Sequence, residues 1–194
     1  YDTATVSGFL HKHGIHNEVK VNIEANHATL AGHSFHHEIA TACAEGIMGS
    51  VDANRGDAQN GWDTDQFPTD IYDAVHGMMV LLEDGGFKRG GFNFDAKVRH
   101  ESVDMEDIFA GHIGGMDTFA RGLEIAHDIL TNSNYKALKS ARYNSFGSGD
   151  GADFRAGKLD LENLRDIAAG QSEPVLHSGK QEQFENLINQ YMLK

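Results

Sequence analysis

Six side chains in the first half of the sequence have the chemistry of ligands for divalent cations. They are five carboxylates and one imidazole: Glu24, His27, Asp52, Asp63, Asp65 and Asp95. Carboxylate oxygens suit hard cations such as Mg²⁺ and Mn²⁺, and an imidazole among them shifts the preference toward Mn²⁺ or Co²⁺. Two cations bridged by one carboxylate would use all six ligands, polarise substrate oxygens and lower the pKa of bound water.

The segment VDANRGDAQNGWDTDQF concentrates negative charge, because Arg55 is its only basic residue. Its aspartates are Asp52, Asp57, Asp63 and Asp65. Either water screens them on a surface loop or they surround a cation, and both readings stay open at this point. An EF-hand loop is a poor fit, since its twelfth position is Asp63 rather than Glu and Gly56 precedes Asp57 instead of following it.

The elements that must position the six ligands repeat one order. Three times, a short run rich in strand-forming residues ends near acidic residues, and a helical pattern follows. The runs are 19–27, ending at Glu24 and His27, 46–54, with Asp52, and 90–98, with Asp95. Alternating strands and helices predict an α/β fold with a parallel sheet, in which binding groups collect at the carboxyl ends of the strands. Asp63 and Asp65 point the same way if their segment is extended.

Helical patterns account for most of the remaining chain. They cover 1–14, 34–45 and a helix capped by Thr69 or Asp70 that stops at Gly85. A further helix follows Asp104, with a break or bend expected near Gly114 and Gly115. Beyond residue 134 the segment 143–158 is typical of a loop, two helical patterns follow, and no strand pattern returns. We therefore expect units at 1–134 and 135–194, the second an arm for subunit contacts.

Composition narrows the class of protein. The 194 residues are 40% hydrophobic and carry a net charge of -13, which repels phosphate backbones and argues against nucleic-acid binding. The longest apolar runs fall short of the ~20 residues of a membrane span, and no signal peptide is visible. Cys43 is the single cysteine, so an internal disulfide is excluded and a reducing, cytoplasmic location is expected. The start at Tyr1 inside a helical pattern indicates processing or truncation.

Other conspicuous residues have structural explanations. His11 and His13 lie at a predicted helix end, where a cation suits the helix dipole. The histidines of HSFHHE are expected to line a helix start on the surface. Trp62 and Phe67 are expected to pack, although sugar sites also use aromatic walls.

Several motifs resemble the xylose isomerase family, specifically its longer-chain class. They are NIEANHATLAGH, GSVDANRGD, GWDTDQFPTD, FNFDAKVR and HIGGMDTFARGL, in that order, with ARYNSFGSG in the tail. The resemblance implies the last three strands and helices of a TIM (β/α)₈ barrel plus a C-terminal arm, completed by association. It also implies a homo-oligomer or a complementing N-terminal half as partner.

The resemblance further implies a reaction and roles for the six ligands. The family interconverts D-xylose and D-xylulose by a hydride shift assisted by two divalent ions, Mg²⁺, Mn²⁺ or Co²⁺. By motif, Glu24 would bridge the ions, Asp52 and Asp95 would complete the first, and His27 and Asp63 would hold the second. Asp65 would join the second ion and assist proton transfer. The family's ring-opening His–Asp pair, tryptophan wall, catalytic lysine and a further glutamate have no counterpart in this sequence.

Two alternatives to a xylose isomerase segment stand. One is a non-catalytic, metal-binding oligomeric fragment of that family, which keeps the ligands but not the reaction. The other is a metal-dependent phosphoesterase on a related barrel. That chemistry favours more histidine ligands and a basic face for DNA, which the acidic composition and the single rim histidine argue against.

Overall fold

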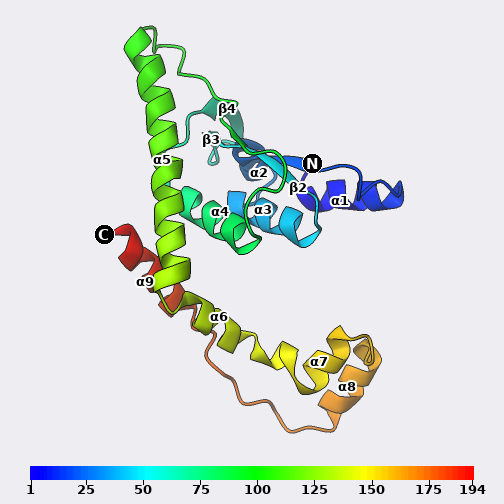
Figure 1. Ribbon diagram of the computed structural model, residues 1–194. Coiled ribbons are helices and arrows are strands. Elements are labelled where there is room, and N and C mark those ends of the chain that lie inside the picture. The colour runs from blue at the N-terminus through cyan, green and yellow to red at the C-terminus, as the bar shows by residue number, and fades with distance from the viewer. The chain divides into compact units, whose positions relative to one another are not determined.

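A computed structural model describes residues 1–194, which cluster into two compact units, 1–127 and 128–194. The chain is a mixed α/β protein in which all strands belong to the first unit (Figure 1). Its strands are β1 (Val21–Glu24), β2 (Met48–Asp52), β3 (Arg55–Asp57), β4 (Trp62–Gln66) and β5 (Phe92–Asn93). Its helices are α1 (Thr3–Lys12), α2 (Ala25–Leu30), α3 (Phe35–Ala44) and α4 (Ile71–Glu83). The long helix α5 (Met105–Asn132) crosses the boundary between the units.

The predicted parallel sheet is confirmed, with strand order β1-β2-β5. Its register sets Glu24 opposite Asp52, and Asp52 opposite Asn93. The carboxyl ends of these strands therefore lie side by side, because parallel strands present their ends at one edge of the sheet. Val51, at the centre of β2, is fully buried.

Three expectations about local structure were wrong. The first strand run gives way to helix α2 at Ala25, so His27 lies on a helix. The third strand is only Phe92–Asn93, and Asp95 lies beyond it in a left-handed backbone conformation with φ of 36°. The acidic segment is not a simple loop, because β3 and β4 pair within it as an antiparallel hairpin.

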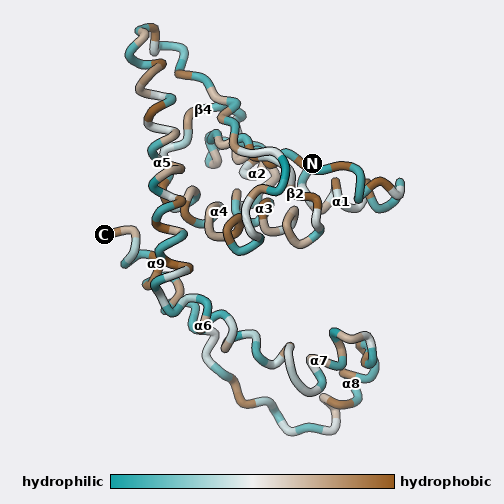
Figure 2. Tube along the Cα trace, viewed as in Figure 1, coloured by the Kyte–Doolittle hydropathy of each residue, from teal (hydrophilic) through white to brown (hydrophobic).

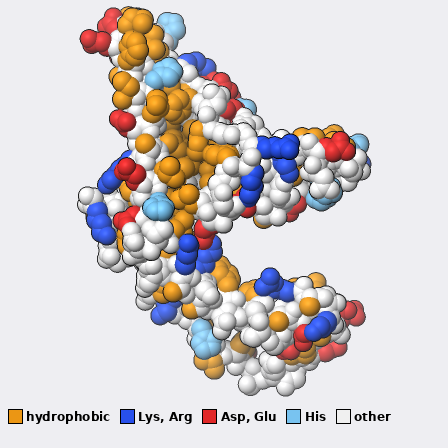
Figure 3. Space-filling view, viewed as in Figure 1, with side chains coloured by type: hydrophobic (Ala, Val, Ile, Leu, Met, Phe, Trp, Pro, Cys, Tyr) orange, Lys and Arg blue, Asp and Glu red, His pale blue; other side chains and the backbone are white.

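Helix α5 is continuous for 28 residues, so the expected break near Gly114 and Gly115 is also wrong. The ~1 kcal/mol that a glycine costs in a helix is small beside the packing of a long amphipathic helix. Brown and teal segments alternate along α5 in Figure 2, as helical amphipathicity requires. Several large apolar side chains of this helix are nevertheless exposed, and Figure 3 shows hydrophobic side chains gathered along it. They include Met105, Ile108, Phe109, Ile113 and Met116.

The second unit contains helices and no strands beyond α5, as expected from the lack of strand patterns. It contains α6 (Tyr135–Arg142), a 3-10 helix η1 (Asn144–Gly147), α7 (Gly149–Arg155), α8 (Leu161–Ala169) and α9 (Gln181–Met192). The expected loop at 143–158 is thus largely helical. Within this unit Tyr191 donates a hydrogen bond to the Asn132 carbonyl, and the rings of Tyr135 and Phe184 meet edge to face.

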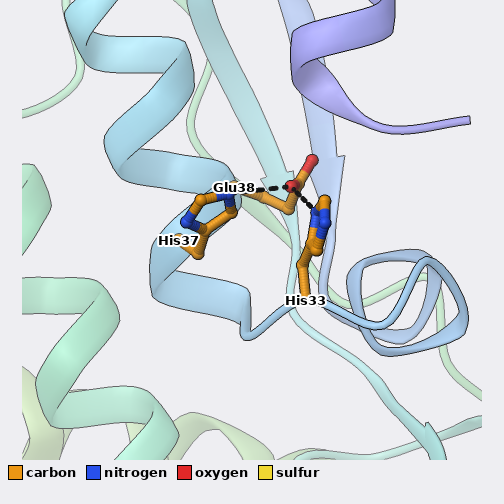
Figure 4. A group of neighbouring side chains, drawn as sticks. All are labelled: His33, His37 and Glu38. Carbon is orange, nitrogen blue, oxygen red and sulfur yellow. Dashed lines mark hydrogen bonds and ion pairs between the residues drawn. The ribbon is translucent and has the colours of Figure 1, made fainter.

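Glu38 joins α1 to α3, and His33 and His37 lie beside its carboxylate (Figure 4). Its buried carboxylate accepts hydrogen bonds from the backbone N–H and the hydroxyl of Thr3, at 2.7 and 2.6 Å. His33 Nδ1 lies 2.6 Å from the other carboxylate oxygen, and His37 Nε2 lies 4.0 Å from it. Ser34 caps α3, so His33 and His37 do line a helix start, as expected.

Burial pushes the pKa of Glu38 upward, but the hydrogen bonds from Thr3 and His33 outweigh burial and hold this pKa below its ordinary value of 4.5. A carboxyl whose folded-state pKa is depressed stabilises the fold above its unfolded pKa. That stabilisation is lost as the pH falls through the folded pKa.

Glu38→Gln is therefore expected to lower the free energy of unfolding by about 1–3 kcal/mol at pH 7, because a charged acceptor of buried hydrogen bonds is lost. The difference from wild type should shrink below pH 4.5, as Glu38 becomes protonated. Urea unfolding at pH 7 and pH 3.5 measures both effects, with the exposed Glu18→Gln as a control within about 0.5 kcal/mol. Equal differences at the two pH values would contradict this account.

Candidate metal centre

Glu24 is the residue around which the predicted ligands assemble. It ends β1 at the N-cap position of α2, without a capping hydrogen bond from its side chain, and that side chain is only 11% exposed. Burial raises the pKa of this carboxyl, opposed by a hydrogen bond from Asn54 and by the nearby His27. A buried carboxylate needs a positive partner to remain ionised, so this position favours a cation.

The structure brings Glu24 together with two different pairs of predicted ligands. Glu24, Asp52 and Asp95 each offer an oxygen within 4.8 Å of the others, and we call them the first triad. Glu24, His27 and Asp63 offer ligand atoms within the same limit, and we call them the second triad. The side chain of Glu24 thus belongs to both triads.

Strand ends and a hydrogen-bond network hold the first triad. Asp52 is buried at the end of β2 and accepts hydrogen bonds from the side-chain amides of Asn22 and Asn93, the latter at 3.0 Å. The buried amide of Asn54 donates to Glu24 Oε1 at 2.8 Å and to the Asp95 carbonyl at 3.1 Å. Asn54 therefore ties the end of β1 to the segment after β5.

The second triad is built from a helix and a hairpin. The ring of His27, on the first turn of α2, is about half exposed and bridges two carboxylates. Its Nδ1 lies 3.1 Å from Glu24 Oε2, and its Nε2 lies 3.2 Å from Asp63 Oδ2. Asp63 comes from β4, in the hairpin.

Asp65 lies beside the second triad but not in it. Its carboxylate pairs with Lys97 Nζ at 2.8 Å and accepts a hydrogen bond from Asn26 at 3.2 Å. The hydrogen bond from Lys97 is the main cause that lowers the pKa of Asp65. Asp63 and Asp65 both contact the amide of Asn26, so they do face the same way as expected for two residues spaced two apart in a strand.

The donor sets suit the expected cations. Three carboxylates offer hard oxygen donors, and two carboxylates with one imidazole suit a cation such as Mn²⁺ or Co²⁺. Three protein ligands leave coordination positions open in each triad for water or substrate. A third group, His33, His37 and Glu38, also offers close ligand atoms, but Glu38 is already bonded to Thr3 and His33 as described above.

The asparagines around the carboxylates were not predicted from the sequence, although their regular spacing from the predicted ligands is visible in it. Asn22 and Asn26 lie two residues before and after Glu24, and Asn54 lies two after Asp52. Asn93 precedes Asp95 by the same interval. Within β1, residues two apart share a face, which places Asn22 on the face of Glu24. Asn26 lies in α2 and Asn54 follows β2, so a strand spacing does not explain their positions.

The aromatic residues of the hairpin region divide. Phe67 is buried and stacks edge to face with Phe94, which confirms that it packs. Trp62 is 67% exposed, so the expectation that it packs was wrong. It begins β4, directly before Asp63.

The chain is similar to known proteins along its whole length. A family model described as the XylA2 C-terminal domain matches residues 139–192. Xylose isomerase 1 of Xanthomonas campestris pv. campestris is 58% identical over all 194 residues, and xylose isomerase 1 of Xanthomonas axonopodis pv. citri is 59% identical over the same length. A xylose isomerase of Xanthomonas oryzae pv. oryzae is 58% identical.

The match covers only part of those relatives. The chain spans 44% of the Xanthomonas campestris and Xanthomonas axonopodis proteins and 43% of the Xanthomonas oryzae protein. No helix of the chain is both long enough and apolar enough to cross a membrane. The resemblance drawn from the motifs is thereby confirmed: over its whole length the chain is similar to the C-terminal part of Xanthomonas xylose isomerases.

Proposed function

We propose that this chain provides the two-cation part of an aldose–ketose isomerase site that interconverts D-xylose and D-xylulose. The single observation that carries the proposal is that Glu24 belongs to both triads, as a bridging ligand requires. The names of the relatives supply the reaction and the sugar.

Each side chain has a definite part in the proposed site. Glu24, Asp52 and Asp95 would hold one divalent cation, Mg²⁺, Mn²⁺ or Co²⁺, and Glu24, His27 and Asp63 would hold the other. When bound, two such cations supply Lewis-acid polarisation of the sugar oxygens. Asp65, held by Lys97 beside the second triad, would accept and return a proton between sugar hydroxyls. Exposed Trp62 could form an apolar wall for the sugar.

We further propose that β1, β2 and β5 with their helices are a sector of a TIM barrel. Three parallel strands leave two sheet edges unpaired, and a closed barrel removes such edges. The partner would be a second copy or the part that the relatives carry outside the matched region. Residues 135–194 would contact another subunit, since Val175 and Leu176 are almost fully exposed.

A titration with Mn²⁺ tests the shared carboxylate. We expect two ions per chain in the wild type and neither in Glu24→Gln, because both triads lose a ligand. Asp52→Asn should weaken one ion by at least about tenfold and His27→Ala the other. Electron paramagnetic resonance of free Mn²⁺, with isothermal calorimetry, gives the stoichiometry. A wild type that binds no ion, or Glu24→Gln that still binds both, would overturn the site.

An isomerase assay separates the enzyme from its non-catalytic alternative. The chain is assayed with D-xylose and Mn²⁺, alone and mixed with the N-terminal part of a relative. We expect turnover only in the mixture, because the other sugar-binding groups of the family have no counterpart here. Two bound ions without turnover in the mixture would favour a non-catalytic metal-binding fragment.

A further inference from the structure

Asn26 is fully buried at the start of α2, although asparagine is a residue that prefers water. Its backbone N–H donates to Asn54 Oδ1 at 3.0 Å. Its side-chain amide donates to Asp63 Oδ1 and, at 3.2 Å, to Asp65 Oδ1. One buried amide therefore connects the helix that bears His27 to both aspartates of β4.

The amide oxygen of Asn26 is buried and has no hydrogen-bond partner. Rotating the amide by half a turn would place this oxygen against two carboxylates, which also only accept hydrogen bonds when ionised. The observed orientation is therefore the better one, even though an unpaired buried acceptor is costly. In this orientation the Asn26 amide nitrogen donates to both aspartates, and the amide oxygen has no hydrogen-bond partner.

Gly56 of β3 provides the space for this arrangement. A Cβ atom at Gly56 would lie 1.7 Å from Asn26 Oδ1 and 2.7 Å from the Trp62 carbonyl oxygen. Any side chain there would displace either the amide or the hairpin. Gly56 therefore lets the hairpin pack closely against Asn26, whose amide also binds Asp63.

Asn22 makes the equivalent contact in the first triad. Its amide nitrogen donates to Asp52 Oδ2, and its oxygen accepts a hydrogen bond from the Ser50 hydroxyl at 2.7 Å. No hydrogen bond joins Asn22 to Asp63, and none joins Asn26 to Asp52. Each asparagine therefore donates a side-chain hydrogen bond to an aspartate of a different triad.

We propose that Asn26 is the positioning residue of the second cation site and sets its affinity independently of the first. This inference rests on the proposed two-cation function. Asn26 holds Asp63 at hydrogen-bonding distance from His27 and keeps Asp65 beside it, two carboxylates that otherwise repel each other. Without its donors, Asp63 is free to turn toward solvent, and the second triad is no longer formed in advance.

The test compares Asn26→Ala and Asn26→Leu with the matched variant Asn22→Ala. The two Asn26 variants both remove the donors, one leaving space and one filling it. We expect them to weaken the second Mn²⁺ ion by about 10–100-fold, the usual effect of losing a group that orients a ligand, and the first by less than about threefold. Asn22→Ala should show the reverse pattern.

Calorimetry and electron paramagnetic resonance measure the two affinities, and the visible spectrum of bound Co²⁺ shows which ligand set is changed. Circular dichroism follows the fold. If both ions weaken in parallel, or both Asn26 variants lose the fold, Asn26 is a residue of general stability and the inference is wrong. If the wild type itself binds fewer than two ions, the proposed function fails instead, so the two failures are distinguishable.

Discussion

The burial of the Glu24 carboxylate is the constraint from which the rest of the site follows. A carboxylate whose side chain is only 11% exposed needs donors or cations, and Glu24 lies against one amide of Asn54 and one ring nitrogen of His27. Three further carboxylates, Asp52, Asp63 and Asp95, lie close to it and add repulsion. Two donors stabilise such a group poorly, and bound cations would balance this negative charge better than water does.

The backbone supplies the geometry for this concentration of charge. Parallel pairing of β1 with β2 sets Glu24 opposite Asp52, and the short pairing of β2 with β5 brings Asn93 and the segment before Asp95 to the same edge. The register of a small sheet is therefore the physical cause of the first triad.

Elements that depend on local sequence patterns were predicted correctly. The parallel sheet follows from the alternation of short strand runs and helices, and Asp70, one of the two predicted caps, binds the start of α4. Prediction failed where tertiary contacts decide. The β3–β4 hairpin forms around buried Asn26, and α5 continues through Gly114 and Gly115. Asp95 lies beyond β5 in a left-handed conformation, and its carbonyl accepts a hydrogen bond from Asn54. Turn and strand propensities are properties of short segments, so they cannot predict structure that depends on such tertiary contacts.

The two triads differ in how firmly the fold holds them, and this difference has a chemical consequence. The ligands of the first triad end strands or follow one, and hydrogen bonds from buried Asn54 and from Asn93 hold the region around them. The second draws on a half-exposed histidine and a two-stranded hairpin, which is a marginal structure without support. A cation held by the first triad would be the static partner, and one held by the second could shift as the hairpin adjusts.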